Sequence, residues 1–109
     1  MAKDIYRQGD ILLIPVKTLP AAVKPVEPEN SRVVLAHGEV TGHHHSFAMS
    51  DRIALFREDG SGGGLFLSVS GDTAPLTHQE HHTLHIPAGT HEIRRQREYH
   101  PEAIRRVED

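Results

Sequence analysis

The chain has 109 residues, which is the length of one small domain. Apolar residues make up 37% of it and charged residues 25%, a balance typical of a globular domain with a small core. No stretch reaches the ~20 apolar residues of a membrane span, and the chain does not begin with the charged-then-apolar pattern of a signal peptide. We therefore expect a cytoplasmic protein with a single domain over residues 1–109 and no membrane partner.

The charge and the residue types exclude several classes of site. The formal net charge is −3, which gives no electrostatic reason to expect nucleic-acid binding. The chain has no Cys, so disulfides, thiolate zinc sites, iron–sulfur clusters and a Cys nucleophile are excluded. Arg94 and Arg95 have acidic neighbours such as Glu92, which predicts a mixed, salt-bridged surface there.

Short apolar runs between Gly and Pro turns predict an all-β fold. The expected strands are 11–16, 32–36, 40–49, 52–57, 65–69, 83–86 and 91–97. The segment 17–30 contains three prolines and is expected to be an extended surface connection, and 60–64 is expected to be a flexible Gly-rich loop. A short helical or extended tail is expected from Pro101 onward. The pattern indicates a small single-domain β-barrel or cupin-like sandwich, and a homo-oligomer that buries the remaining apolar surface.

The run His43-His44-His45 is the first candidate site in a chain with ten His. Alternation along a strand places His43, His45, Phe47 and Met49 on one face, and the apolar pair favours burial of that face. His44 is then solvated. Two inward imidazoles need partners, and either a divalent metal or backbone carbonyls could supply them. We expect His43 and His45 to be metal ligands.

A second histidine group lies in the segment 76–85. His78 and His81 are three residues apart in an expected turn, where their rings can converge on one point. Together with the two inward strand histidines they predict a three- or four-His metal site. Glu80 lies between them and is a candidate catalytic residue, which orients an imidazole or accepts a proton from bound water; the alternative is a solvated carboxylate. His78 or His82 could carry the released proton.

Two segments resemble the motifs of the cupin family. The segment 84–91 is similar to the second cupin motif, in which Pro-x-Gly precedes a metal-binding His, here His91. The segment 38–45 is similar to the first motif, with His43 and His45 as its His-x-His pair. The chain as a whole resembles short, uncharacterised bacterial and phage-encoded His-rich β proteins. This second resemblance is carried by Arg7-Gln8-Gly9-Asp10, 38–43, Leu76-Thr77-His78, Glu80-His81 and 96–99. It implies that the four candidate ligands belong together, and it implies no reaction.

The ligand types point to a metal and a function. Imidazoles without thiolates favour Zn²⁺, with Fe²⁺, Co²⁺, Ni²⁺ and Cu²⁺ as alternatives. Three His leave an open position that suits catalysis, whereas four suit a structural or storage site. We expect a zinc enzyme that activates water for a small-molecule substrate, specifically in carbon dioxide hydration, because zinc lowers the pKa of bound water to about 7. Phe47 and Met49 would supply the few apolar groups that carbon dioxide needs.

Three alternatives of other kinds stay open. The first is a non-catalytic metal-binding or metal-sensing module, and the second is a cupin-like metal-dependent oxygenase or isomerase. The third is a phage or bacterial interaction domain with solvated histidines. From the residue pattern alone, the other histidines are expected at the surface; they are His37, His85, His91 and His100.

Overall fold

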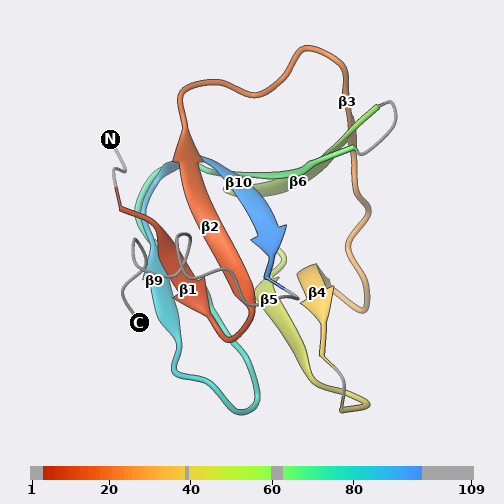
Figure 1. The fold of residues 1–109 in the computed structure, drawn as a ribbon, viewed down its shortest axis with the longest axis vertical. Helices are drawn as coiled ribbons and strands as arrows, with labels where there is room; N and C mark the ends of the chain where they lie inside the picture. The colour runs from red at the N-terminus through yellow and green to blue at the C-terminus, as the bar shows by residue number, and fades with distance from the viewer. Residues whose placement is uncertain (1–3, 39, 60–62, 97–109) are drawn as a thin grey trace.

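The structure is a computed structural model, and it describes residues 4–38, 40–59 and 63–96. Every regular element in these ranges is a β-strand, which confirms the all-β prediction (Figure 1). The strands are β1 Tyr6–Gln8, β2 Ile11–Val16, β3 Val23–Pro25, β4 Arg32–His37, β5 His44–Ala48, β6 Ile53–Glu58, β7 Leu65–Val69, β8 Ala74–Leu76, β9 Leu84–Ile86 and β10 Gly89–Arg95. The described residues include no helix that could cross a lipid bilayer. The tail expected from Pro101 lies outside these residues.

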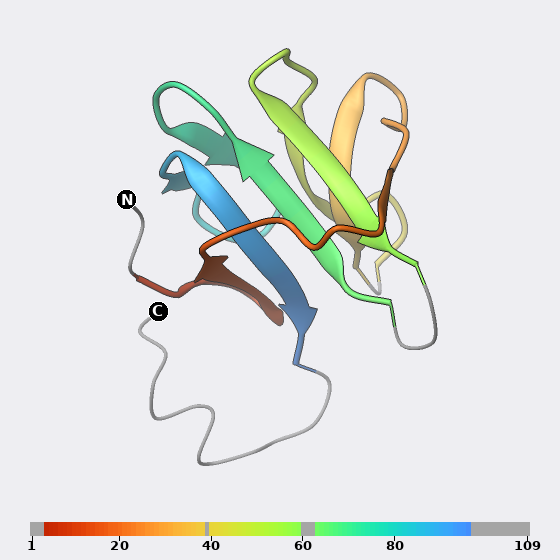
Figure 2. The same cartoon turned by 90° about the horizontal axis from the view of Figure 1, so that it is seen from above.

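Six strands form one antiparallel sheet in the order β1-β2-β10-β7-β6-β3. The hairpins β4–β5 and β8–β9 form two further two-stranded sheets, and β4 is the light orange strand of Figure 2. A bridge between Ser46 and Thr77 connects the two hairpins. No closed barrel is found among the described strands. The predicted barrel or cupin-like form is therefore still a prediction.

The core joins the large sheet to the two hairpins. Leu13 and Leu67 of the sheet are fully buried, and so are Phe47, Leu76 and Ile86 of the hairpins. All five belong to one apolar cluster. Burying a side chain of this size contributes roughly 1.5–3 kcal/mol, so this packing holds the hairpins against the sheet.

The strand predictions agree best where the apolar pattern is longest. β2 and β7 begin and end at the predicted residues. The segment 17–30 is extended, as expected, and its short strand β3 pairs with β6 at the edge of the sheet. β1 and β8 were not predicted, because each has three residues and is too short to display a period.

Two side chains lie on the opposite side from the prediction. Met49 is 57% exposed, because β5 ends at Ala48 and the alternation does not continue beyond it. His91 is fully buried rather than at the surface, because it precedes Ile93 by two residues and shares its inward face of β10. The buried His91 donates from Nε2 to the carbonyl oxygen of Pro87 at 3.0 Å. His37 and His85 are exposed, as expected.

Candidate metal centre

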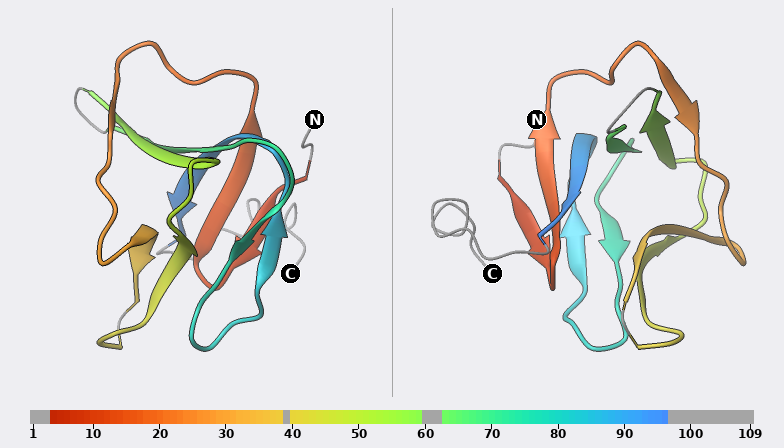
Figure 3. Two further views of the ribbon diagram at one scale, coloured as in Figure 1. Left: turned by 180° about the vertical axis from the view of Figure 1, so that it is seen from behind. Right: turned by 45° about the vertical axis from the view of Figure 1, so that its right-hand side comes forward.

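Three loops and the end of one strand meet at one end of the molecule. The turn between β1 and β2, the β4–β5 loop and the β8–β9 loop lie on the same side of the fold (Figure 3). Together with the end of β10 they enclose a pocket of about 740 Å³. All of the predicted ligands line this pocket, and they are His43, His45, His78 and His81. Glu80 lines it as well.

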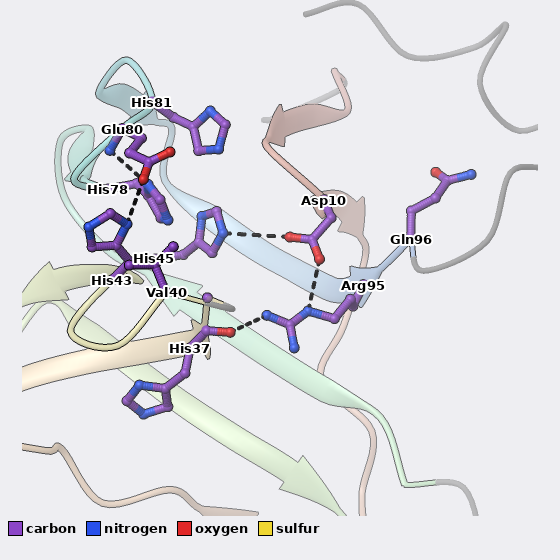
Figure 4. A pocket seen from close by; sticks show the side chains of 11 residues that line it. Asp10, His37, Val40, His43, His45, His78, Glu80, His81, Arg95 and Gln96 are labelled. Carbon is purple, nitrogen blue, oxygen red and sulfur yellow. Dashed lines mark hydrogen bonds and ion pairs between the residues drawn. The ribbon is translucent and has the colours of Figure 1, made fainter.

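The rings of these histidines are close together (Figure 4). The ring centres of His45, His78 and His81 form a triangle with sides of 4.3, 4.6 and 6.0 Å, and the centre of His43 is 5.7 Å from that of His78. Imidazoles bound tetrahedrally to one zinc at ~2 Å have ring centres roughly 5 Å apart. Within the described part of the chain, no three His, Cys, Asp or Glu side chains have their donor atoms already grouped as around an ion. Binding therefore requires the imidazole rings to rotate. The backbone segments that carry these rings are already close to one another.

His45 has a defined orientation because Gln8 holds it. The Gln8 amide nitrogen donates to the carbonyl oxygens of Leu76 and His82, both at 2.9 Å, so its Oε1 must be the atom that faces His45. Nδ1 of His45 donates to this oxygen at 2.9 Å. Nε2 of a neutral His45 then keeps its lone pair. Burial, with a further contribution from nearby His78, lowers the pKa of His45 to about 4, so the ring is neutral at pH 7.

Glu80 acts on the two neighbouring histidines. Its Oε2 lies 2.9 Å from Nδ1 of His43, so it orients that ring. Its backbone N–H donates to Nδ1 of His78 at 3.0 Å. A neutral His78 therefore carries its proton on Nε2. To bind a metal through Nε2, the proton would have to move to Nδ1 and the ring would have to rotate away from the Glu80 N–H. Burial, followed by the nearby His81 and His43, lowers the pKa of His78.

Two charged residues of the pocket were not predicted as site residues. Asp10 lies in the turn before β2, with Oδ1 3.6 Å from Nε2 of His45 and Oδ2 3.1 Å from Nε of Arg95 (Figure 4). Arg95 also donates from Nη2 to the carbonyl oxygen of His37. The sequence analysis named Asp10 only within a motif that carries the family resemblance, and it assigned Arg95 to a salt-bridged surface. No local pattern links either residue to the histidines.

Gly9 allows the β1–β2 turn to approach the histidines. Its φ of +59° is in the left-handed region that favours Gly. A Cβ at this position would lie 2.7 Å from Nε2 of His81 and 3.3 Å from Cε1 of His45. A side chain at residue 9 would therefore require the His81 ring to move away from the turn that carries Asp10.

Several residues that the sequence analysis connected with the site lie elsewhere. His44, which was not expected to belong to the site, is indeed outside the pocket lining; its ring is half-buried and hydrogen-bonded through Nδ1 to Oγ of Ser46 at 2.9 Å. Phe47 and Met49 do not line the pocket either. His91, which the cupin resemblance implies as a ligand, lies in the core and is also absent from the lining.

The fold and the site define an all-β domain with a histidine-lined pocket at one end. The chain belongs to the family described as "Domain of unknown function (DUF8820)", which matches residues 7–96. This range contains every residue that lines the pocket. The match fits the expected resemblance to uncharacterised proteins, and it does not bear on a bacterial or phage origin or on the cupin resemblance. No curated protein and no solved structure matches the chain.

Proposed function

We propose that the pocket binds a divalent transition-metal ion, Zn²⁺ first, and activates a water molecule on it. The observation that carries this proposal is the convergence of four imidazoles, in which the neighbouring ring centres are 4.3 to 6.0 Å apart. His45 and His81 hold the ion with at least one of His43 and His78. Fe²⁺, Co²⁺ and Ni²⁺ are the alternative ions for such a donor set.

The charge of the pocket supports a cation as the ligand. The lining contains the carboxylates of Asp10 and Glu80 and one opposing cation, Arg95. With neutral histidines the lining has a net charge of −1, which attracts a dication. The unprotonated Nε2 of His45 offers that dication a lone pair without first releasing a proton.

The chemistry follows from the ion. A zinc ion with three imidazoles keeps one position for water and lowers the pKa of that water to about 7, which yields hydroxide at neutral pH. Carbon dioxide hydration is the specific reaction that we propose, with His78 and Glu80 carrying the released proton to solvent. The pocket of about 740 Å³ has more room than carbon dioxide needs, and its lining does not include Phe47 or Met49. We therefore propose a small activated ester as a second substrate, which the same metal-bound hydroxide would hydrolyse.

The test compares zinc-loaded protein with two histidine variants. Stopped-flow hydration of carbon dioxide and hydrolysis of 4-nitrophenyl acetate are measured for the wild type, for His45→Ala and for His85→Ala, which changes an exposed histidine outside the pocket. We expect catalysis in the wild type and in His85→Ala, and loss of catalysis in His45→Ala and after chelation. Zinc binding with only the uncatalysed rates would contradict an enzyme and favour a metal-binding or metal-sensing module. Protein that binds no metal would contradict the metal centre and favour an interaction domain.

We also propose that the domain is a cytoplasmic homo-oligomer with a cupin-like arrangement of strands. The absence of Cys fits a reducing compartment. The large sheet ends at β1 and β3, and neither pairs with a further strand in the described ranges. These edges leave backbone groups that a second copy of the chain can pair with, over the three residues of each edge strand. A solution mass equal to one chain would contradict the oligomer.

A further inference from the structure

Asp10 and His45 face each other across the pocket without a hydrogen bond. Oδ1 of Asp10 lies 3.6 Å from Nε2 of His45. This separation exceeds the 2.7–3.2 Å range of an N–H···O hydrogen bond. Two donor atoms that each lie ~2.0–2.2 Å from one ion, at a tetrahedral angle, are roughly 3.4 Å apart. The distance therefore suits two atoms that share a metal ion.

The hydrogen bonds around His45 determine which atoms face each other. Two carbonyl acceptors fix the Gln8 amide, and the amide oxygen takes the proton of Nδ1, as described above. With the Nδ1 proton directed to Gln8, Nε2 is the ring atom that can accept or coordinate on the pocket side, and the carboxylate of Asp10 is an acceptor too. Two acceptors that face each other at this distance are stabilised by a cation between them.

The other oxygen of Asp10 is occupied by a different partner. Oδ2 lies 3.1 Å from Nε of Arg95, and Arg95 is held in turn by the carbonyl oxygen of His37. The ion pair leaves Oδ1 directed toward the histidines (Figure 4). Gly9 brings the same turn against the rings of both His81 and His45.

We propose that Asp10 is a carboxylate ligand of the metal through Oδ1, with His45 and His81 as the imidazole ligands and Arg95 as the residue that positions the carboxylate. This inference rests on the proposed metal centre and changes its donor set from histidine alone to histidine and carboxylate. A set of two imidazoles and one carboxylate suits Fe²⁺ as well as Zn²⁺. His43 and His78 then lie beside the ion, where His43 is oriented by Glu80.

The experiment titrates metal-free protein with Co²⁺ and follows the visible absorption of the bound ion. The variants are Asp10→Asn, which removes the carboxylate charge, and Arg95→Gln, which breaks the same ion pair but keeps the carboxylate. We expect Asp10→Asn to weaken Co²⁺ binding roughly 100-fold or more and to change the absorption spectrum, because a donor is lost. Arg95→Gln removes a residue that orients the ligand and is expected to weaken binding only about 10-fold, with the wild-type spectrum kept. Asp10 is nearly half exposed, and Asp10→Ser is a second variant for the same loss.

Each other outcome has a defined meaning. Equal losses in Asp10→Asn and Arg95→Gln, with unchanged spectra, would show that only the ion pair matters and would overturn the inference. Wild-type binding in Asp10→Asn together with lost binding in His45→Ala would overturn Asp10 as a ligand while the proposed metal centre stands. A wild-type protein that binds no Co²⁺, Zn²⁺ or Fe²⁺ would overturn both.

Discussion

Nδ1 of His45 donates to Oε1 of Gln8 at 2.9 Å, across 37 residues of sequence. The same amide donates to the carbonyl oxygens of Leu76 and His82, so one buried side chain connects β1, β5 and the β8–β9 loop. It also selects the nitrogen of His45 that faces the pocket. Gln8 thus joins the stability of the fold to the chemistry of the site.

Replacing Gln8 should affect both properties. Gln8→Leu leaves two carbonyl oxygens and the His45 Nδ1–H without their partner, so we expect a loss of about 2–4 kcal/mol in the free energy of unfolding. We also expect metal binding to weaken 10–100-fold, as for other groups that orient a ligand. Urea unfolding and metal titration measure the two effects. Gln79→Leu is the matched control, because Gln79 is exposed and its side chain is hydrogen-bonded to His44 rather than to His45. Similar losses in both variants would contradict the role of Gln8.

The adjacent histidines at and just before the start of β5 should differ in their effect on metal content. His45→Ala is expected to lose metal most severely, since this ring is buried in the pocket wall, and His43→Ala is expected to lose it as well. His44→Ala should keep its metal, because His44 lies outside the lining. In the β8–β9 loop, His81→Ala should be more damaging than His82→Ala. Elemental analysis of dialysed protein gives the metal content, and equal content in all variants would contradict a discrete site.

Alanine substitutions at two glycines can distinguish the effect of backbone strain from the effect of a new contact with the site. Gly9 and Gly42 both have positive φ, at +59° and +88°, so substitution by Ala should cost about 1 kcal/mol of stability at each. Only at Gly9 would the new Cβ meet an imidazole, whereas nothing lies within 4 Å at Gly42. We expect Gly9→Ala alone to weaken metal binding. Thermal unfolding and Co²⁺ titration test this, and the prediction fails if Gly42→Ala weakens binding equally.

The stability of the metal-free protein should fall in mild acid. Burial lowers the pKa of His45 from 6.5 to about 4 and also lowers the pKa of His91. Below pH 6.5 the unfolded chain binds protons that the folded chain does not, so the stability present above pH 6.5 is lost as the pH falls toward about 4. His45 alone should account for roughly 2–3 kcal/mol of this loss. Urea unfolding at several pH values, with chelator present, measures it.

The control for this pH dependence uses one buried and one exposed histidine. His45→Gln should give a shallower loss of stability between pH 6.5 and 4, because the group with the lowered pKa is removed. His85→Gln should keep the wild-type slope, since His85 is exposed. Constant wild-type stability across this range would contradict the prediction.

The sequence by itself determined the features that depend on local alternation. The β7 pattern predicted a strand over its full length, and the pattern after the triple-His run predicted that His45 and Phe47 face inward. Both succeed because neighbouring side chains of a strand must point to opposite faces. The grouping of His78 and His81 with the strand histidines was expected from residue type and family resemblance, and all four line one pocket.

Only the tertiary structure decided which distant groups reach those histidines. Gln8 ends β1, Asp10 lies in the β1–β2 turn and Arg95 ends β10. They meet because β2 pairs with both β1 and β10 in an antiparallel register. The same pairing places His91 in the core. Period-two alternation predicts which side chains share a face of a strand, but it does not predict which strands become neighbours. That choice depends on how the apolar faces of the sheet and the two hairpins pack together, which is a non-local property of the chain.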